Sequence, residues 1–133
     1  SDVCIDFATN NLKAGWPHGL DCEAFSVDLL AKAARYATRS EEREHVTPWM
    51  RRHPGLRLAH LPGPGGVVQG YRWTLDYEED LEFFRQLLDL APPPPHRDWR
   101  YYADILDQRP DIVAVNSHRH QPRQHDSGYR HSV

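Results

Sequence analysis

A lone acid in the sequence lies where carboxylates often bind metal ions. Asp76 separates "YRWTL", which is rich in aromatic and branched residues, from a segment with apolar residues at helical spacing. A carboxylate at the end of a strand in an open α/β sheet points into the crevice where ligands bind, and it can hold Mg²⁺ together with substrate phosphates. Asp76 and Glu79 also fit a capping box, and the local sequence alone favours this second interpretation.

Two further acids form a second candidate site. Asp21 and Glu23 are two positions apart on a predicted strand, so both side chains point to one face. Paired carboxylates on one face suit a metal ion or a cluster of sugar hydroxyls, whereas the alternative is the solvated face of an edge strand. The preceding Gly15, Pro17 and Gly19 predict a shaped loop, which is consistent with the rim of a substrate site.

The stretch "SEEREHVTPWMRRHP" combines acids, a histidine and arginines at helical spacing. A solvated helix is the alternative to a site, since each exposed ion pair on it would contribute only ~0.2–0.5 kcal/mol. His45 could equally be a buried histidine with satisfied hydrogen bonds. The arginines carry donors suited to carboxylate or phosphate: Arg43, Arg51 and Arg52.

The elements that must position these residues alternate between strands and helices. Period-two patterns predict strands over 3–9, 20–25, 56–61 and 71–75. Apolar residues at helical spacing predict helices over 27–37, 77–90 and from 98 onward, with Ser26 and Asp98 as N-caps. A helix from Ser40 should break near Thr47 because of Pro48. This order of elements belongs to an α/β or α+β layered fold.

The composition is that of one small domain with a modest core. The chain has 133 residues and a net charge of −3, which gives no broad attraction to nucleic acid or to an anionic membrane. No apolar run approaches the ~20 residues that span a bilayer, and no signal segment is recognised. We therefore expect a cytoplasmic protein whose two cysteines, Cys4 and Cys22, are reduced and buried.

The last third of the chain differs in composition from the rest. "APPPPH" predicts a stiff polyproline spacer, followed by an appended helix. "DIVAVN" could be a short strand or the end of that helical layer. From His118 the chain is polar and predicts a loose tail, in which nothing fixes the geometry of a metal site. The predicted divisions are 1–91, 92–117 and 118–133, the last being rich in histidine.

Three segments, in their order along the chain, resemble a known family. "WPHGLDCEAF", "EREHVTP" and "RWTLDYEEDL" are similar to motifs of the spore-coat-polysaccharide type of cytidylyltransferase, which is related to enzymes that make CMP-activated acidic sugars. Each segment alone is a weak signal, but their order and spacing together are specific. The resemblance covers about Asp2 to Ala91, with Trp16 in place of the usual tyrosine.

The resemblance implies a partial Rossmann-like α/β/α nucleotidyltransferase fold. In such enzymes a sugar oxygen attacks the α-phosphate of CTP and releases pyrophosphate, while Mg²⁺ neutralises charge on the phosphates. The residue matching the metal ligand is Asp76, so the resemblance favours metal binding there. The residues that would line or brace the substrate side are Asp21, Glu23, Arg43, His45 and Arg72.

The family's nucleotide-binding motifs are not found in this sequence. We see neither the Gly- and Arg/Lys-rich loop that cradles the triphosphate nor the first acidic metal-binding turn. We therefore expect the acceptor-sugar-binding half of such an enzyme, inactive alone. A half-sheet would expose a strand edge that seeks a second copy or the missing half, with Trp16, Trp49 and Trp73 available for burial. The alternatives are a non-catalytic binding or assembly module derived from that fold, or an unrelated α/β domain.

Overall fold

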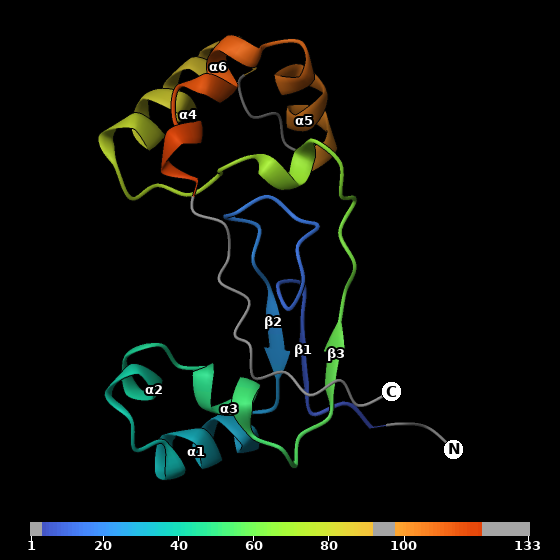
Figure 1. Cartoon of the computed structure of the whole chain (residues 1–133), viewed down its shortest axis with the longest axis vertical. Coiled ribbons are helices and arrows are strands. Elements are labelled where there is room, and N and C mark those ends of the chain that lie inside the picture. The colour runs from blue at the N-terminus through green and yellow to red at the C-terminus, as the bar shows by residue number, and fades with distance from the viewer. Residues whose placement is uncertain (1–3, 92–97, 121–133) are drawn as a thin grey trace. The chain divides into compact units, whose positions relative to one another are not determined.

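The computed structural model describes residues 4–91 and 98–120, which form two compact units (Figure 1). The described part of the first unit comprises residues 4–13 and 21–62. The second comprises residues 14–20, 63–91 and 98–120. Each unit has its own hydrophobic core. Among the described helices, none has the length and apolar composition needed to cross a membrane.

The first unit contains a three-stranded sheet in the order β2 (Glu23–Phe25), β1 (Phe7–Thr9), β3 (Leu58–His60). β1 runs antiparallel to β2 and parallel to β3. The strands predicted over 3–9, 20–25 and 56–61 are confirmed, but each is shorter than expected, and Val3 lies outside the described residues. The mixed sheet with its helices confirms the predicted α/β class.

The register of this sheet produces two rows of side chains on one face. Phe7 pairs with Phe25 and Leu58, and its ring stacks on that of Phe25 with 5.8 Å between centroids. Two residues further along, Thr9 pairs with Glu23 and His60. Because paired residues point to the same face, an apolar row lies beside a polar row at the carboxyl end of β1.

Three helices complete the first unit: α1 (Val27–Tyr36), α2 (Ser40–Glu44) and α3 (Pro48–Arg52). Ser26 caps α1 as predicted, because its hydroxyl accepts a hydrogen bond of 3.1 Å from the Leu29 backbone N–H. Pro48 begins α3, which confirms the predicted break after α2. Leu29, Ala33 and Met50 then pack with Phe7 to form the core of this unit.

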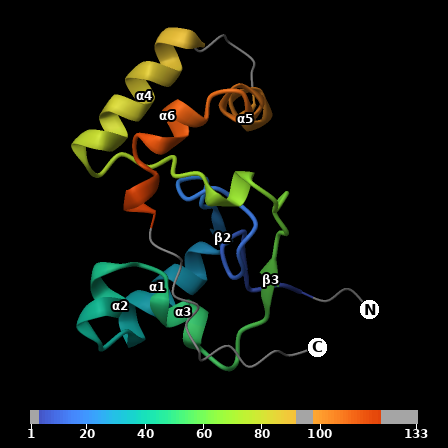
Figure 2. The same ribbon diagram turned by 45° about the horizontal axis from the view of Figure 1, so that its top comes forward.

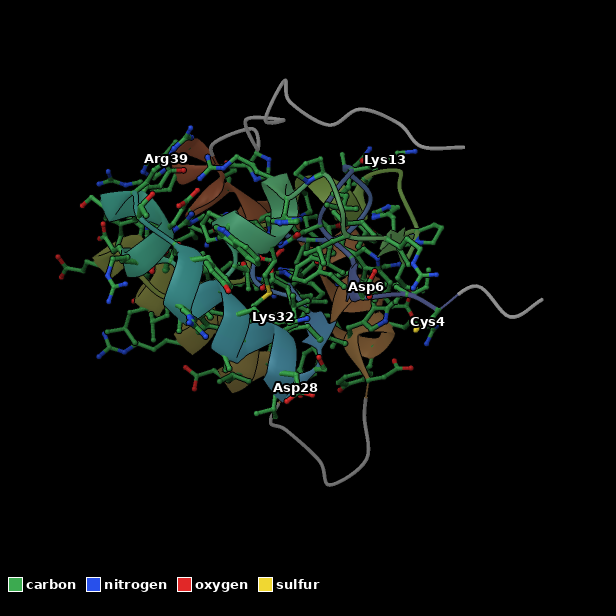
Figure 3. The ribbon with its side chains drawn as sticks, turned by 90° about the horizontal axis from the view of Figure 1, so that it is seen from below. Cys4, Asp6, Lys13, Asp28, Lys32 and Arg39 are labelled. Atoms are coloured by element: carbon green, nitrogen blue, oxygen red, sulfur yellow. The ribbon has the colours of Figure 1, made fainter. Side chains whose placement is uncertain are left out.

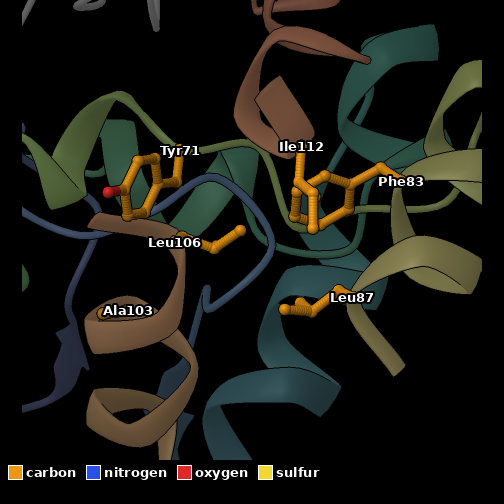
Figure 4. Close-up of a cluster of buried hydrophobic side chains, with 6 residues drawn as sticks. All are labelled: Tyr71, Phe83, Leu87, Ala103, Leu106 and Ile112. Atoms are coloured by element: carbon orange, nitrogen blue, oxygen red, sulfur yellow. The ribbon is translucent and has the colours of Figure 1, made fainter. Parts of the chain in front are cut away.

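The second unit is built from helices around one apolar cluster (Figure 4). Its elements are the 3-10 turn η1 (Val68–Gly70), α4 (Glu78–Leu90), α5 (Trp99–Asp107), α6 (Pro110–Ala114) and the turn η2 (Ser117–Arg119). α6 contacts both α4 and α5 (Figure 2). The buried cluster thus joins residues on both sides of the predicted division at Ala91: Tyr71, Phe83, Leu87, Ala103, Leu106 and Ile112.

The strand predicted over 71–75 is absent, and this prediction is wrong. Arg72 instead makes an isolated parallel bridge with His18. His18 donates to the Tyr71 carbonyl at 3.0 Å and accepts from the Trp73 N–H at 2.6 Å. The loop over 14–20 offers only this one residue for pairing, so no ladder extends along the segment. Leu75 is consequently 60% exposed rather than packed inward.

The helix α4 begins where the periodicity predicts, but a different face of it is buried. The apolar spacing in this helix predicts that Leu81, Phe84, Leu87 and Leu88 are buried, whereas Leu81 and Leu88 are 38% and 39% exposed. The buried face carries Asp80, Phe83 and Leu87. A polar residue belongs to this face because Asp80 pairs with the buried Arg72, a contact that apolar periodicity does not reveal.

The structure also tests the predictions for the two cysteines and for the last third of the chain. Both cysteines, Cys4 and Cys22, are free thiols on the surface, so their predicted burial is wrong. Each precedes a strand rather than lying within the row that faces the core. "DIVAVN" is helical, since α6 covers most of it, and Asp98 caps α5 as predicted. His118, predicted to begin a loose tail, lies in η2, while 121–133 and the polyproline residues 92–97 lie outside the described residues.

Candidate functional site

Asp21 and Glu23 belong to one hydrogen-bonded network in the first unit. Arg51, on α3, donates through Nη2 to Glu23 Oε1 and to Asn11 Oδ1. The amide Nδ2 of Asn11 donates to Asp21 Oδ1 at 3.1 Å. Thr47 adds a hydroxyl hydrogen bond of 3.2 Å to Glu23 Oε1. The structure therefore connects the two predicted carboxylates, although only Glu23 lies within β2.

This network lies beside the polar row at the carboxyl end of β1. Glu23 is half-buried next to Thr9, and His60 follows on the other side. Burial of the His60 ring lowers its pKa, with a further contribution from the positive charge of Lys13, so the imidazole is neutral near pH 7. Carboxylate, amide and imidazole groups together can accept and donate hydrogen bonds to a polyhydroxyl ligand. The carboxyl ends of parallel strands are where open α/β sheets place their ligands.

Sequence reasoning did not assign three residues of this cluster: Asn11, Thr47 and His60. Arg51 was identified as a donor, but without a partner. Asn11 lies two residues after a predicted strand and His60 is the penultimate residue of another, and those positions near strand ends were the available signal. No local pattern predicts that Arg51, 28 positions after Glu23, reaches its carboxylate.

Arg43 and His45, the predicted bracing residues, lie on the surface of the first unit. The Arg43 Nη1 group lies 3.5 Å from the carbonyl oxygens of Ala34 and Ala37, at the carboxyl end of α1. A cation at this end of a helix is favourable and bonds carbonyls that lack helical partners. His45 follows the last residue of α2 and is exposed, so the alternative of a buried histidine is wrong.

Asp76, in the second unit, lies just before α4 with its side chain 59% exposed. Its Oδ2 atom accepts hydrogen bonds from Arg72 Nη2 at 2.9 Å and from Thr74 Oγ1 at 3.1 Å. The N-cap of α4 is Tyr77, and the capping carboxylate is Asp80, which accepts from the backbone N–H groups of Asp76 and Tyr77 at 3.0 and 3.1 Å. The predicted capping box of Asp76 with Glu79 is wrong, because the helix starts two residues after Asp76.

Arg72 is buried in the second unit and holds Asp80 with two hydrogen bonds. Arg72 Nε donates to Asp80 Oδ1 and Nη2 donates to Oδ2, both at 2.8 Å. The hydrogen bonds from Arg72 hold the pKa of Asp80 well below its usual range, and Asp80 in turn raises the pKa of Arg72. Arg72 is only 5% exposed, and it also donates to the exposed carboxylate of Asp76.

The described residues contain no group of three or more His, Cys, Asp or Glu side chains arranged to hold a metal ion. Asp76 would thus provide one ligand and share the ion with other groups. Its donor atom fits Mg²⁺, which prefers carboxylate oxygens and commonly keeps only one or two of them beside phosphates and water. Among the described residues, both hydrogen bonds to the Asp76 carboxylate are accepted by Oδ2.

A hollow of about 470 Å³ lies on the other face of the sheet in the first unit. Ala8 and Ala24 contribute to it, and they point away from the polar row because side chains alternate along a strand. Its charged residues are Asp6, at the start of β1, and Asp28 and Lys32 on α1 (Figure 3). None of these residues was predicted as part of a site.

Comparison with known proteins gives three matches. The chain is 34% identical over 108 residues to the uncharacterized protein MJ1063 of Methanocaldococcus jannaschii, covering 77% of this chain and 43% of that protein. It is 31% identical over 101 residues to the spore coat polysaccharide biosynthesis protein SpsF of Bacillus subtilis, covering 74% and 42%. A cytidylyltransferase structure from Leptospira borgpetersenii superposes with a TM-score of 0.73 and 24% identity, covering 82% and 45%. No protein-family model matches the chain.

The fold is therefore that of a cytidylyltransferase-like nucleotidyltransferase. By sequence the chain is homologous to SpsF, and the resemblance to the spore-coat-polysaccharide type of cytidylyltransferase is confirmed. The chain spans less than half the length of the curated relatives that it matches.

Proposed function

We propose that the chain forms the acceptor-sugar side of a cytidylyltransferase-like enzyme that activates a sugar with CTP for polysaccharide biosynthesis. The observation that carries this proposal is the network in which Arg51 and Asn11 join the carboxylates of Asp21 and Glu23. Support for the reaction class comes from the homology to SpsF and from the fold shared with a cytidylyltransferase.

In this proposal the network orients the acceptor sugar. Asp21 is exposed, so its carboxylate can accept hydrogen bonds from sugar hydroxyls. Glu23 is held by Arg51 and Thr47, which restricts its rotamer and presents the carboxylate in one direction. Holding a nucleophile in a fixed direction lowers the entropic part of the barrier. In the proposal Arg43 braces the carboxyl end of α1, and His45, the C-cap of α2, would support the same side of the unit.

The proposed reaction joins the acceptor oxygen to the α-phosphorus of CTP. The bond between that phosphorus and the pyrophosphate group breaks, pyrophosphate leaves with the electron pair of the broken bond, and the proton of the acceptor hydroxyl passes to water. When bound, Mg²⁺ neutralises charge on the phosphates and positions them. Asp76 is the residue of this chain that would hold the ion, while Arg72 and Thr74 fix its Oδ2 atom.

Binding of free acidic sugars to the purified chain tests the acceptor role. In a two-dimensional NMR titration, we expect shifts of the backbone signals of Asn11, Asp21 and Glu23. The variants Asp21→Asn and Glu23→Gln should weaken these shifts, because each removes a charged acceptor. Asp28→Asn is the matched control, since Asp28 is an exposed acid on α1 (Figure 3). Equal binding by all four proteins would contradict the proposal.

An assay of pyrophosphate release tests the reaction class. The chain alone, with CTP, Mg²⁺ and acidic sugars, should release no pyrophosphate, because no triphosphate-cradling loop is recognised in its sequence. A protein that includes both this chain and such a loop should be active, and Asp76→Asn should abolish its Mg²⁺-dependent turnover. Turnover that survives in this variant would remove Asp76 from the proposed mechanism.

A further inference from the structure

The segment after α5 reaches Asp76 through a chain of buried contacts. Asn116, which follows α6 and is 1% exposed, donates through Nδ2 to Asp80 Oδ1 at 2.9 Å and to the Arg72 carbonyl at 3.0 Å. Arg72 then donates to Asp76. One amide group thereby links a residue 40 positions downstream to the exposed carboxylate before α4.

A second contact from the same segment reinforces the first. Arg72 Nη1 lies 3.4 Å from the carbonyl oxygen of Arg119, in η2. The Arg119 side chain donates to Glu79 Oε1 at 2.9 Å, and its guanidinium carbon lies 4.3 Å from the centre of the Tyr77 ring. Tyr77 and Glu79, which both precede Asp80 at the start of α4, are thus also held by η2.

The charges of this network matter for a cation at Asp76. Arg72 carries one positive charge and contacts both Asp76 and Asp80. If Arg72 faced Asp76 alone, the pair would be neutral and would attract a divalent cation weakly. Because Asp80 already balances Arg72, the three groups together keep one net negative charge, and the exposed member of the group is Asp76.

We propose that Asn116 is a positioning residue, which holds the Asp80–Arg72 pair so that Asp76 presents a fixed, charged carboxylate to a divalent cation. This inference rests on the proposed role of Asp76. Groups that orient a metal ligand without touching the metal commonly change metal affinity by 10–100-fold when they are removed. Asn116 has the required geometry, since its buried amide donates both to the Arg72 carbonyl and to the Asp80 carboxylate.

Mn²⁺ titration of the full chain, followed by NMR, tests this inference. In the wild-type chain the paramagnetic ion should broaden the backbone signals of Thr74, Asp76 and Tyr77, and Asp76→Asn should abolish the effect. Asn116→Ala should weaken the apparent affinity for Mn²⁺ at least about tenfold. It should also speed hydrogen exchange of the Asp76 and Tyr77 amides, which donate to Asp80.

Ser117→Ala is the matched control, because it alters the neighbouring side chain, whose 3.5 Å contact is with the Ala114 carbonyl outside the network. If Asn116→Ala fails to fold, Asn116→Ser keeps one donor and should give a smaller change in the same direction. If Asn116→Ala binds Mn²⁺ with the same affinity as Ser117→Ala, the inference is overturned and the proposed function stays intact. Absence of Mn²⁺ broadening in the wild-type chain would overturn both this inference and the metal role of Asp76, while sugar binding at Asp21 and Glu23 would remain a separate result.

Discussion

Both oxygens of the Asp80 carboxylate accept hydrogen bonds from the Arg72 guanidinium, each at 2.8 Å, and neither residue is more than 5% exposed. Removing one partner of such a pair leaves an uncompensated buried charge. We therefore predict that Asp80→Ala lowers the free energy of unfolding by ~3–5 kcal/mol, as measured by urea denaturation.

Two further variants separate the effect of this buried pair from a general loss of stability at the start of α4. Glu79→Ala removes the neighbouring, more exposed ion pair with Arg119 and should lower the free energy of unfolding far less than Asp80→Ala does. Replacing both partners, in the double variant Arg72→Met with Asp80→Leu, should recover much of the lost stability, since no buried charge is then left alone. A cost below about 1 kcal/mol for Asp80→Ala would contradict the buried pair.

Gly19 is required by the path of the backbone. Its φ angle is +114°, and a Cβ atom added there would lie 2.0 Å from the carbonyl oxygen of Trp73. Gly19→Ala should therefore lower the melting temperature clearly, because it combines an unfavourable backbone conformation with a clash against main-chain atoms. Gly70→Ala is the control, since no atom lies within 4 Å of the added Cβ. Equal melting temperatures for the two variants would show that the loop does not approach Trp73 as described.

Tyr71 should make the second unit sensitive to alkaline pH. Its hydroxyl donates to Asp107 Oδ1 at 2.7 Å, and burial together with this carboxylate raises the pKa of the phenol far above its usual value of about 10. Above that usual value the unfolded chain releases the proton while the folded chain keeps it, so stability is complete below about pH 10 and falls as the pH rises.

Urea denaturation between pH 8 and 11 would measure this effect. Tyr71→Phe should flatten the alkaline part of the stability curve, because the titrating group is gone. Tyr36→Phe provides the comparison, since Tyr36 is 55% exposed on α1. An unchanged alkaline slope in Tyr71→Phe would assign the effect to other groups.

Self-association is expected through the edges of the sheet. β2 and β3 are the outer strands of the three-stranded sheet in the described residues, and unpaired edges favour pairing with another chain. The indoles are less available than expected, because Trp16 packs on Trp99, Trp49 on Tyr36 and His53, and Trp73 on Tyr71.

Light scattering over a range of concentrations should therefore show dimers or larger species. Val27→Lys, at a position on α1 that is 81% exposed, should leave this association unchanged. If the lysine abolishes association, the apolar surface of α1 and not a strand edge is the contact. A monomer at every concentration would contradict the prediction altogether.

Interactions between residues close in the sequence determine several elements of the fold without any tertiary contact. The Ser26 cap, the break at Pro48 and the Asp98 cap depend on residues within a few positions of one another, so the sequence predicted them correctly. The helical period located α4 for the same reason. The ordered motifs also indicated the cytidylyltransferase resemblance, because a family pattern is a property of sequence and spacing.

Tertiary structure decided which charged groups meet. The predicted strand before Asp76 did not form because, among the described residues, the segment pairs only with His18. The buried face of α4 includes Asp80 because Asp80 pairs with the buried Arg72. Likewise, Arg51 reaches Glu23, and Asn116 reaches Asp80, across 28 and 36 positions of the chain. Hydrophobic periodicity describes how one element meets apolar surroundings. A buried ion pair depends instead on two elements placing opposite charges within about 3 Å of each other, and that placement exists only in the folded chain.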